Sequence, residues 1–183
     1  GKDMAANRAE AKKLLKAAGA SGLNINFNNR AVDQPYKVVG TWAVDQWKKI
    51  GVNTKQRVQP SPQFYATLRK KKDFDVSVDF NCQSVINPIA DITKFLGSAG
   101  NNYGQYEDAE LEAIYEKILK APTEKEQRSL IRQYETRALS DQAHLQITLW
   151  WYKINPHRSY VKGWKIAPSH YLNQSLDNVW LDK

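Results

Sequence analysis

The stretch DFDVSVDFNCQSVINP, residues 73–88, decides the fold expected of this chain. From Phe74 to Phe80, apolar residues alternate with polar ones, which is the period of two expected of a strand packed on one face. The alternation ends there, and small polar side chains follow as far as Pro88. Ligands of open α/β sheets bind at the carboxyl ends of the strands, so we expect residues 79–87 to face a ligand.

The sequence before this stretch predicts two further strands, each followed by a helix. Helical spacing of apolar residues indicates a first helix at 7–18 that ends at Gly19. The following segments are a strand at 23–29, a helix from Pro35 to a stop at Gly51, a strand at 52–59, and a helix that begins at Ser61 and Pro62. The order strand, helix, strand, helix, strand requires parallel strands joined by right-handed crossovers. We therefore expect an α/β fold of three layers with a mainly parallel core, in which residues 28–30 and 79–84 emerge at the same edge.

The second half of the chain predicts a different arrangement. A short helix at 89–96 leads into a loop rich in glycine and asparagine. Two helices follow and are expected to pair as a hairpin against the sheet, and Thr123 and Glu126 form a capping box at the start of the second one. Alternation from 145 to 154 predicts a later returning strand. The tail that follows keeps large apolar groups without a clean period, so it needs a surface to pack against.

Composition limits the classes of function. The 183 residues are enough for one core, and no stretch approaches the roughly 20 apolar residues of a membrane helix. The net charge of +8 raises nucleic acid as a partner, but the basic residues are spread between glutamates, with residues 69–72 as the one run. We expect no nucleic-acid binding, although a basic nucleic-acid- or protein-binding module stays the alternative. The start, GKDMAANRAEAKK, is no signal peptide. Because the chain starts inside an amphipathic helix pattern, we expect a piece of a longer protein.

Catalytic and metal-binding motifs are not found in the sequence. His144, His157 and His170 are far apart and show no metal-ligand spacing, and there is no G-x-S-x-G, P-loop or GxGxxG motif. The single Cys82 excludes a disulfide within the chain and argues against a structural zinc site. We predict that the chain is no enzyme and holds neither a metal nor a cofactor.

What remains is the chemistry of recognition. Amide side chains donate and accept hydrogen bonds, so they suit a polar ligand that is bound without reaction, although loop and capping roles fit the same residues. Trp151 lies near the end of the predicted late strand and is a stacking candidate, with core packing as the alternative. The candidate ligand-binding residues from these patterns are Asp79, Asn81, Gln83, Ser84, Asn87, Asn102 and Trp151.

Several segments together resemble a known family. They are EAKKLLKAAGA before a strand, DQWKKIGVNTKQRV, FYATLRKKKDFDVSV, NYGQYEDAELEAIYEK and RQYETRALSDQAHLQITLWW. In this order they look like the C-terminal part of the family 5 extracellular solute-binding proteins of ABC transporters, the oligopeptide- and dipeptide-binding group. The resemblance implies a periplasmic or otherwise extracytoplasmic receptor with two type II-like lobes that close on a solute and deliver it to a membrane permease. Residues 1–165 would then be the C-terminal ligand-binding lobe, and residues 166–183 would pack on the first lobe, which this chain lacks.

The resemblance also bears on the ligand. Peptide-binding members carry a tryptophan and, three residues later, an aspartate that holds the amino terminus of the ligand, in a pattern like W-C-A-D-x-x-x-P. The matching residues are Asn81, Cys82, Gln83 and Ser84, with Pro88 at the same distance. Without the carboxylate, the charge-assisted contact to an ammonium group is lost.

A neutral or anionic small polar solute, peptide-like or not, is therefore expected, with Arg30 as its counter-charge. Cys82 matches a position that some members link by a disulfide to a residue upstream of this chain. Asn102 matches a position of the N-Y-x-x-Y segment that can reach the ligand.

Overall fold

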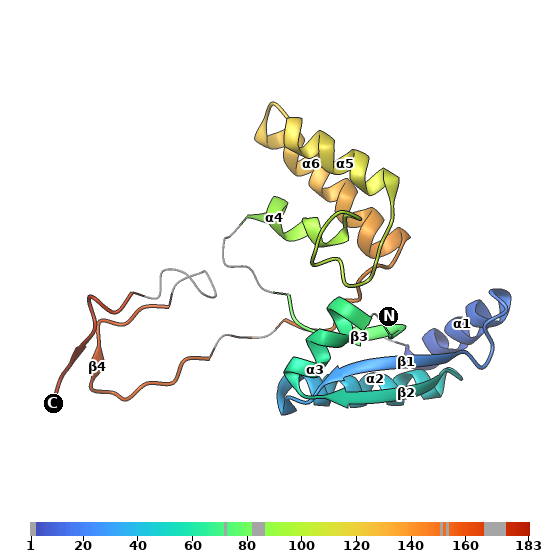
Figure 1. The fold of residues 1–183 in the computed structure, drawn as a ribbon, viewed down its shortest axis with the longest axis horizontal. Coiled ribbons are helices and arrows are strands. Elements are labelled where there is room, and N and C mark those ends of the chain that lie inside the picture. Colours follow the sequence, from blue (N-terminus) through green and yellow to red (C-terminus); the bar gives the residue numbers. More distant parts are fainter. Residues whose placement is uncertain (1–2, 72, 82–86, 151, 153, 167–174) are drawn as a thin grey trace. The chain divides into compact units, whose positions relative to one another are not determined.

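The computed structural model describes residues 3–71, 73–81, 87–150, 152, 154–166 and 175–183 (Figure 1). The chain divides into two compact units, Gly1–Phe80 and Asn81–Lys183. Gln83, Ser84 and Trp151, which the sequence predicts to contact a ligand, lie outside the described residues, as does Cys82. No helix in the described ranges combines the length and the apolar composition needed to cross a membrane.

The first unit is a three-stranded parallel sheet with helices between the strands. Its strands are β1 (Asn24–Arg30), β2 (Asn53–Gln59) and β3 (Val76–Val78), in the order β2-β1-β3. Its helices are α1 (Met4–Ala17), α2 (Val38–Lys49) and α3 (Ser61–Ala66), with the short helical turns η1 (Asp33–Lys37) and η2 (Thr67–Lys71). The predicted α/β class and the parallel strand order are confirmed.

Two layers of helix cover the sheet. The Trp47 ring of α2 lies 5.2 Å from the Phe27 ring of β1, edge to face, while α3 contacts both β1 and β2. Phe27, Val52, Phe64 and Leu68 are the buried apolar residues of this unit. Since the chain crosses from β2 over β1 to β3, the two crossover segments alternate between the faces of the sheet, as in a doubly wound fold.

Helix α1 forms where the sequence predicts it but does not bury its apolar stripe. The carboxylate of Asp3 accepts from the backbone N–H groups of Ala5 and Ala6 and so caps the helix. Gly19 ends it with a φ of 68°, a left-handed conformation that glycine adopts without strain. Leu14 is 59% exposed, and no residue of the helix is buried.

Strand β3 is shorter than the predicted strand from 74 to 80. The Asp75 carboxylate accepts the backbone N–H of Asn26, and the Asp75 backbone N–H donates to the Asn26 carbonyl. The side chain therefore takes a place that a backbone carbonyl would hold if the ladder continued. Phe80, at the other end, is 44% exposed and lies beyond the paired residues.

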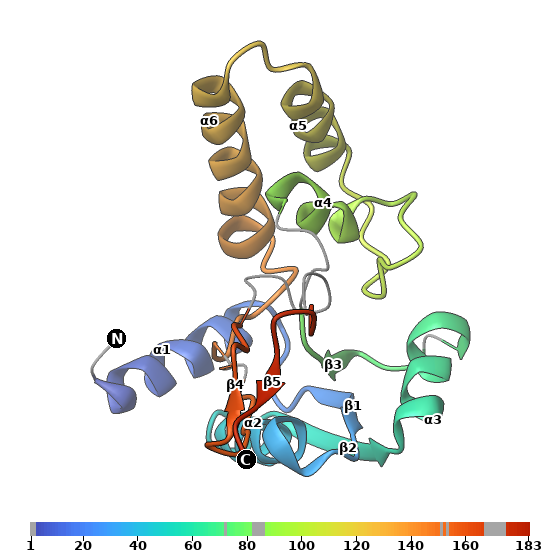
Figure 2. The ribbon, with the colours of Figure 1, turned by 90° about the vertical axis from the view of Figure 1, so that its left-hand side faces the viewer.

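The second unit holds a helical hairpin with a core of its own. Helices α5 (Ala109–Lys120) and α6 (Glu124–Glu135) lie side by side in Figures 1 and 2, preceded by α4 (Pro88–Ile92) and η3 (Thr93–Phe95) and followed by η4 (Thr136–Asp141). Thr123 caps α6 by accepting the Glu126 backbone N–H, as the sequence predicts. The buried residues of this core are Ile92, Phe95, Leu96, Leu111, Ile114, Ile118, Tyr134 and Ala138.

The strand predicted at 145–154 is wrong. Residues 143–150, Tyr152 and Ile154 have no regular secondary structure. The strands described in this unit, β4 (Val161–Lys162) and β5 (Trp180–Leu181), pair with each other as an antiparallel ribbon and with no part of this segment. An alternating pattern makes a strand only where a neighbouring backbone can pair with it, and Leu149 stays 44% exposed.

Candidate functional site

The carboxyl ends of the three parallel strands bring several polar side chains together. Strand β1 ends at Arg30, β2 ends just before Pro60 and Ser61, and β3 is followed directly by Asp79. Since the strands run parallel, these three ends lie at one edge of the sheet, which we call the carboxyl edge. This confirms the expected juxtaposition of the ends of β1 and β3.

Arg30 connects all three strand ends. Its Nε donates to the Ser61 hydroxyl over 3.2 Å, and its Nη1 donates to the Tyr65 hydroxyl over 3.3 Å. Nη1 also lies 3.6 Å from Oδ1 of Asp79. The side chains of Arg30 and Asp79 are 16% and 20% exposed, so this ion pair is mostly buried but still reaches solvent.

Three aromatic rings surround the Arg30 guanidinium. Its central carbon lies 4.7 Å from the centre of the Tyr36 ring, 5.3 Å from that of Tyr65 and 5.6 Å from that of Phe80. These rings come from η1, α3 and the residue after Asp79. Each distance is within the range of a cation–π contact. We call Arg30, Tyr36, Ser61, Tyr65, Asp79 and Phe80 the edge cluster.

Burial sets the protonation chemistry of the edge cluster. Burial raises the pKa of the Asp79 carboxyl above its ordinary value of 3.8, even though the Phe80 backbone N–H and the charge of Arg30 act to lower it. Burial, together with the charge of Asp79, raises the pKa of Tyr65 to about 12. The Tyr65 hydroxyl therefore stays protonated at neutral pH, and it donates a hydrogen bond to Oδ1 of Asp79 over 3.2 Å.

A second row of polar groups lies deeper in the sheet on the same face as Arg30. Asn28 precedes Arg30 by two residues, and its neighbours across the sheet are Arg57 on β2 and Ser77 on β3. Both amide atoms of Asn28, Oγ of Ser77 and Nε of Arg57 are buried and have no hydrogen-bond partner among the described residues. Buried polar groups of this kind are uncommon in folded proteins, and they distinguish this face of the sheet from an ordinary packed one.

Three predicted ligand residues of the second unit have local hydrogen bonds. Asn81 donates to the Asp91 carboxylate over 3.3 Å, and the Asn87 side chain accepts the Ile89 backbone N–H at the start of α4. Asn102 is 7% exposed. Its side-chain amide donates hydrogen bonds to the carbonyls of Leu96 and Tyr106 and accepts one from the Tyr106 backbone N–H. The ligand role of these three residues stays a prediction.

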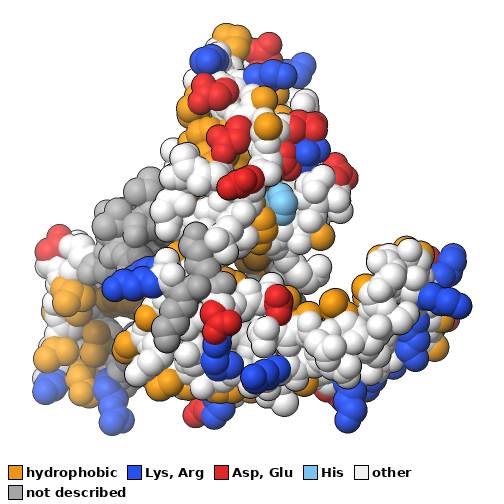
Figure 3. All heavy atoms as spheres, turned by 45° about the vertical axis from the view of Figure 1, so that its right-hand side comes forward, with side chains coloured by type: hydrophobic (Ala, Val, Ile, Leu, Met, Phe, Trp, Pro, Cys, Tyr) orange, Lys and Arg blue, Asp and Glu red, His pale blue; other side chains and the backbone are white. Residues whose placement is uncertain are grey.

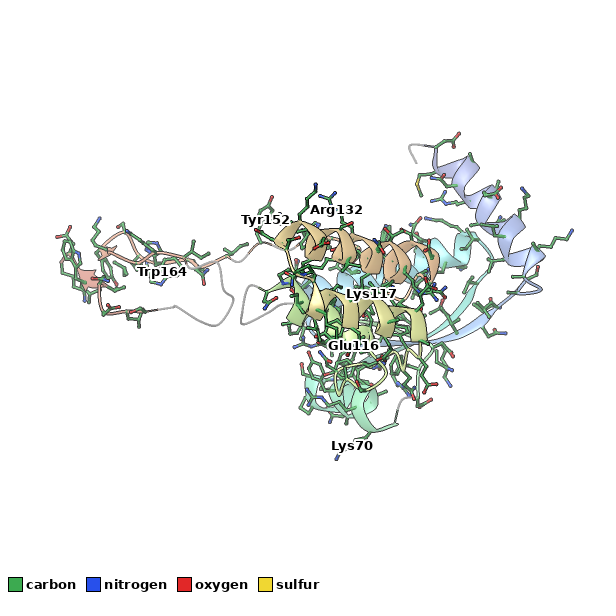
Figure 4. All side chains as sticks on the ribbon, turned by 90° about the horizontal axis from the view of Figure 1, so that it is seen from above. Lys70, Glu116, Lys117, Arg132, Tyr152 and Trp164 are labelled. Carbon is green, nitrogen blue, oxygen red and sulfur yellow. The ribbon has the colours of Figure 1, made fainter. Side chains whose placement is uncertain are left out.

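The surroundings of Trp151 bear on its predicted stacking role. Trp150 is 88% exposed and Tyr152, labelled in Figure 4, is 85% exposed. The residues on either side of Trp151 in sequence are thus not core residues. The stacking role of Trp151 itself stays a prediction.

Sequence reasoning missed most of the edge cluster. It identified Arg30 and Asp79, but it took Ser61 only as the start of a helix and did not single out Tyr65. The signal available was that Ser61 and Tyr65 are four residues apart in a helix that starts at a strand end, so both hydroxyls lie on one helix face above that edge. Tyr36 and Phe80 have no comparable signal, because Tyr36 comes from the short helical turn η1 and Phe80 lies beyond the paired residues of β3.

The positive charge of the chain is not gathered into one patch on the face drawn in Figure 3. Lysine and arginine side chains are scattered there and lie among acidic ones. On the helical hairpin, Arg128 pairs with Glu124 and Lys120 with Glu116 at a spacing of four residues. This is the pattern of solvated helix faces rather than of a nucleic-acid interface.

Comparison with known proteins identifies relatives of the chain. The sequence model of the bacterial extracellular solute-binding proteins, family 5 Middle, matches residues 1–103. No curated protein sequence matches the chain.

Several solved structures share its fold. The periplasmic binding protein DppA of Helicobacter pylori, in complex with the peptide STSA, has a TM-score of 0.78 and 18% identity, over 94% of this chain and 34% of its own. OppA of Haemophilus influenzae, complexed with RPPGFSPFR, has a TM-score of 0.67 and 20% identity, over 74% and 27%. The substrate-binding domain of an oligopeptide ABC transporter of Bacillus anthracis has a TM-score of 0.64 and 22% identity, over 74% and 27%. The chain thus has the fold of type II periplasmic binding proteins and spans about a third or less of the length of these relatives.

Proposed function

Because this chain belongs to the bacterial extracellular solute-binding proteins of family 5, we propose that it is the C-terminal ligand-binding lobe of a receptor for an ABC importer. The receptor acts outside the cytoplasm, binds a small polar solute and delivers it to a membrane permease. A peptide-like solute is included, since two of the structural relatives are complexed with peptides.

The observation that carries this proposal is the edge cluster. It lies at the carboxyl edge of a parallel sheet, where ligands of such folds bind. It offers a guanidinium, a carboxylate and two hydroxyls within hydrogen-bonding reach of one another, walled by aromatic rings. Such convergent polar groups in an apolar wall fix the orientation of a small ligand.

The chemistry of the cluster supports binding without reaction. Its tyrosine stays protonated, and its carboxylate is held by Arg30 and Tyr65 rather than next to a nucleophile. A receptor of this kind works by hinge closure, in which a second lobe covers the bound solute and the closed form is recognised by the permease. The edge cluster would supply one half of the closed site.

The C-terminal ribbon supports the proposed contact of residues 166–183 with another lobe. In strand β5, Trp180 and Leu181 are 55% and 56% exposed. Large exposed apolar side chains of this kind are found where a surface packs against a partner.

A transport experiment in the host tests the proposed function. Native mass spectrometry of the protein purified from its host identifies the bound solute, and uptake of the labelled solute is then measured in a strain without the gene. We expect uptake to fall to background, to return with the wild-type gene and with Arg128→Gln, and not to return with Arg30→Gln. Arg128 is the control because it is an exposed arginine paired within its own helix. Unchanged uptake in the deletion strain would overturn the proposal.

A further inference from the structure

We propose that the Arg30–Asp79 ion pair opens to take a compact zwitterion, such as an amino-acid or betaine head group. The carboxylate of the solute takes the place of Asp79 at Arg30, and its cationic nitrogen takes the place of Arg30 at Asp79. This inference rests on the proposed function and extends it, because it names the class of solute that the edge cluster binds.

The geometry of the Arg30–Asp79 ion pair favours an exchange of partners over a tight, fixed contact. Nη1 of Arg30 lies 3.6 Å from Oδ1 of Asp79, which is longer than a paired, two-bond contact between an arginine and a carboxylate. The hydrogen bonds of the guanidinium, from Nε to Ser61 and from Nη1 to Tyr65, are to neutral hydroxyls. A guanidinium carries five N–H donors, so Arg30 retains donors with which to hold a solute carboxylate by two bonds.

The surroundings of the guanidinium are those of a cation site. Asp79 and the rings of Tyr36, Tyr65 and Phe80 enclose a positive group, and within the structure that group is the chain's own Arg30. Aromatic faces beside a carboxylate favour cations with a diffuse charge, including alkylated ammonium groups. If Arg30 swings towards a solute carboxylate, a solute cation can occupy the place that it leaves.

Charge balance selects a zwitterion over a simple ion. The pair is about four-fifths buried, and its formal charges cancel. A purely anionic solute that captured Arg30 would leave Asp79 charged without a cation, and a purely cationic solute would do the same to Arg30. An unpaired charge in a buried position is strongly unfavourable, whereas a zwitterion gives each group a new partner. In agreement with this cost, burial raises the pKa of the Asp79 carboxyl although the Phe80 N–H, Arg30 and Tyr65 act to lower it.

Nuclear magnetic resonance of the 183-residue chain, labelled with ¹⁵N, tests the inference. The Nε–H signal of Arg30 is followed during titration with glycine betaine, and in parallel with its two halves, sodium acetate and tetramethylammonium chloride, at matched ionic strength. The same titrations are run on Asp79→Asn, which keeps the shape and removes the charge. Asp73→Asn is the matched control, because Asp73 forms the more exposed pair with Arg57 on the same sheet.

We expect glycine betaine to shift the Arg30 signal saturably, with each half-ligand weaker by about tenfold or more, since each would leave a buried charge unpaired. Asp79→Asn should weaken betaine binding by about tenfold or more, while Asp73→Asn leaves it within about twofold. Acetate that binds as well as betaine, an unchanged affinity in a folded Asp79→Asn, or no shift up to about 100 mM betaine would overturn the inference. If Asp79→Asn does not fold, the comparison of betaine with its halves on the wild-type chain decides the matter.

These results separate the two proposals. A solute that is not zwitterionic, but whose uptake is lost with the gene, would overturn the inference and leave the importer role intact. If betaine binds at Arg30 but deletion of the gene changes no uptake, the importer role would be overturned and the inference would stand.

Discussion

The Tyr65 hydroxyl donates a hydrogen bond to Oδ1 of Asp79 and so joins helix α3 to the end of strand β3. The same hydroxyl accepts from Nη1 of Arg30 at the end of β1. One side chain therefore connects β1, β3 and helix α3, which lies between β2 and β3 in the sequence. This linkage holds Arg30 and Asp79 at the same edge of the sheet.

Removing this hydroxyl should weaken the first unit. Tyr65→Phe deletes one hydrogen bond to a carboxylate and one from a guanidinium, so we expect a loss of about 1.5–3 kcal/mol in the free energy of unfolding. Tyr152→Phe is the control, because Tyr152 is 85% exposed, and it should change stability by less than about 0.5 kcal/mol. Urea-induced unfolding measures both. Equal stability of the two variants would show that the hydroxyl of Tyr65 contributes nothing.

Asp79 should make stability depend on pH. Its folded-state pKa lies above its ordinary value of 3.8, so the folded chain binds this proton more tightly than the unfolded chain. The resulting contribution to stability is fully present below pH 3.8 and is lost as the pH rises through the raised pKa. The free energy of unfolding of the wild type, measured relative to Asp79→Asn in urea, should fall across this window. A difference that is constant or grows with pH would contradict the prediction.

Gly40 should not tolerate even a methyl group. A Cβ at this position of α2 would lie 1.5 Å from Oδ1 of Asn29, a fully buried side chain of β1. Alanine is favoured over glycine in a helix by about 1 kcal/mol, but we expect overpacking to outweigh this and Gly40→Ala to destabilise the chain by about 1–3 kcal/mol.

The control for this substitution is Gly100→Ala. A Cβ at Gly100 meets nothing within 4 Å, so stability should change by less than about 0.5 kcal/mol. Thermal unfolding compares the two variants. A stabilised Gly40→Ala would mean that Asn29 moves aside at little cost.

Asn102 offers a test between a structural and a ligand-binding role. Asn102→Ala removes three hydrogen bonds to the backbone of the loop between η3 and α5, so we expect a loss of about 2 kcal/mol or more in stability. Hydrogen exchange of the Tyr106 amide, which donates to this side chain, should accelerate in parallel. Solute binding that disappears in a variant of unchanged stability would instead establish Asn102 as a ligand residue.

Much of the first unit follows from its sequence because its signals are local. The spacing of apolar residues predicts α1, β1, α2 and β2 to within a few residues, and Gly19 and Gly51 end their helices with positive φ values as expected. The failures have a different origin. The alternation from 145 to 154 is as regular as that of β1, but it has no strand beside it in the described part of the chain. The stripe of α1 is helical in spacing, yet none of its residues is buried.

The sequence by itself determined which elements form and in what order, because periodicity, capping and glycine stops depend on residues within a turn or two of one another. It also determined that polar groups would stand at the strand ends. Only the tertiary structure decided that Arg30 would contact Tyr65 and Asp79. Tyr65 is separated in sequence from Arg30 by 35 residues and from Asp79 by 14. The crossovers between parallel strands bring such distant residues to one edge, and burial there decides their charge and pKa.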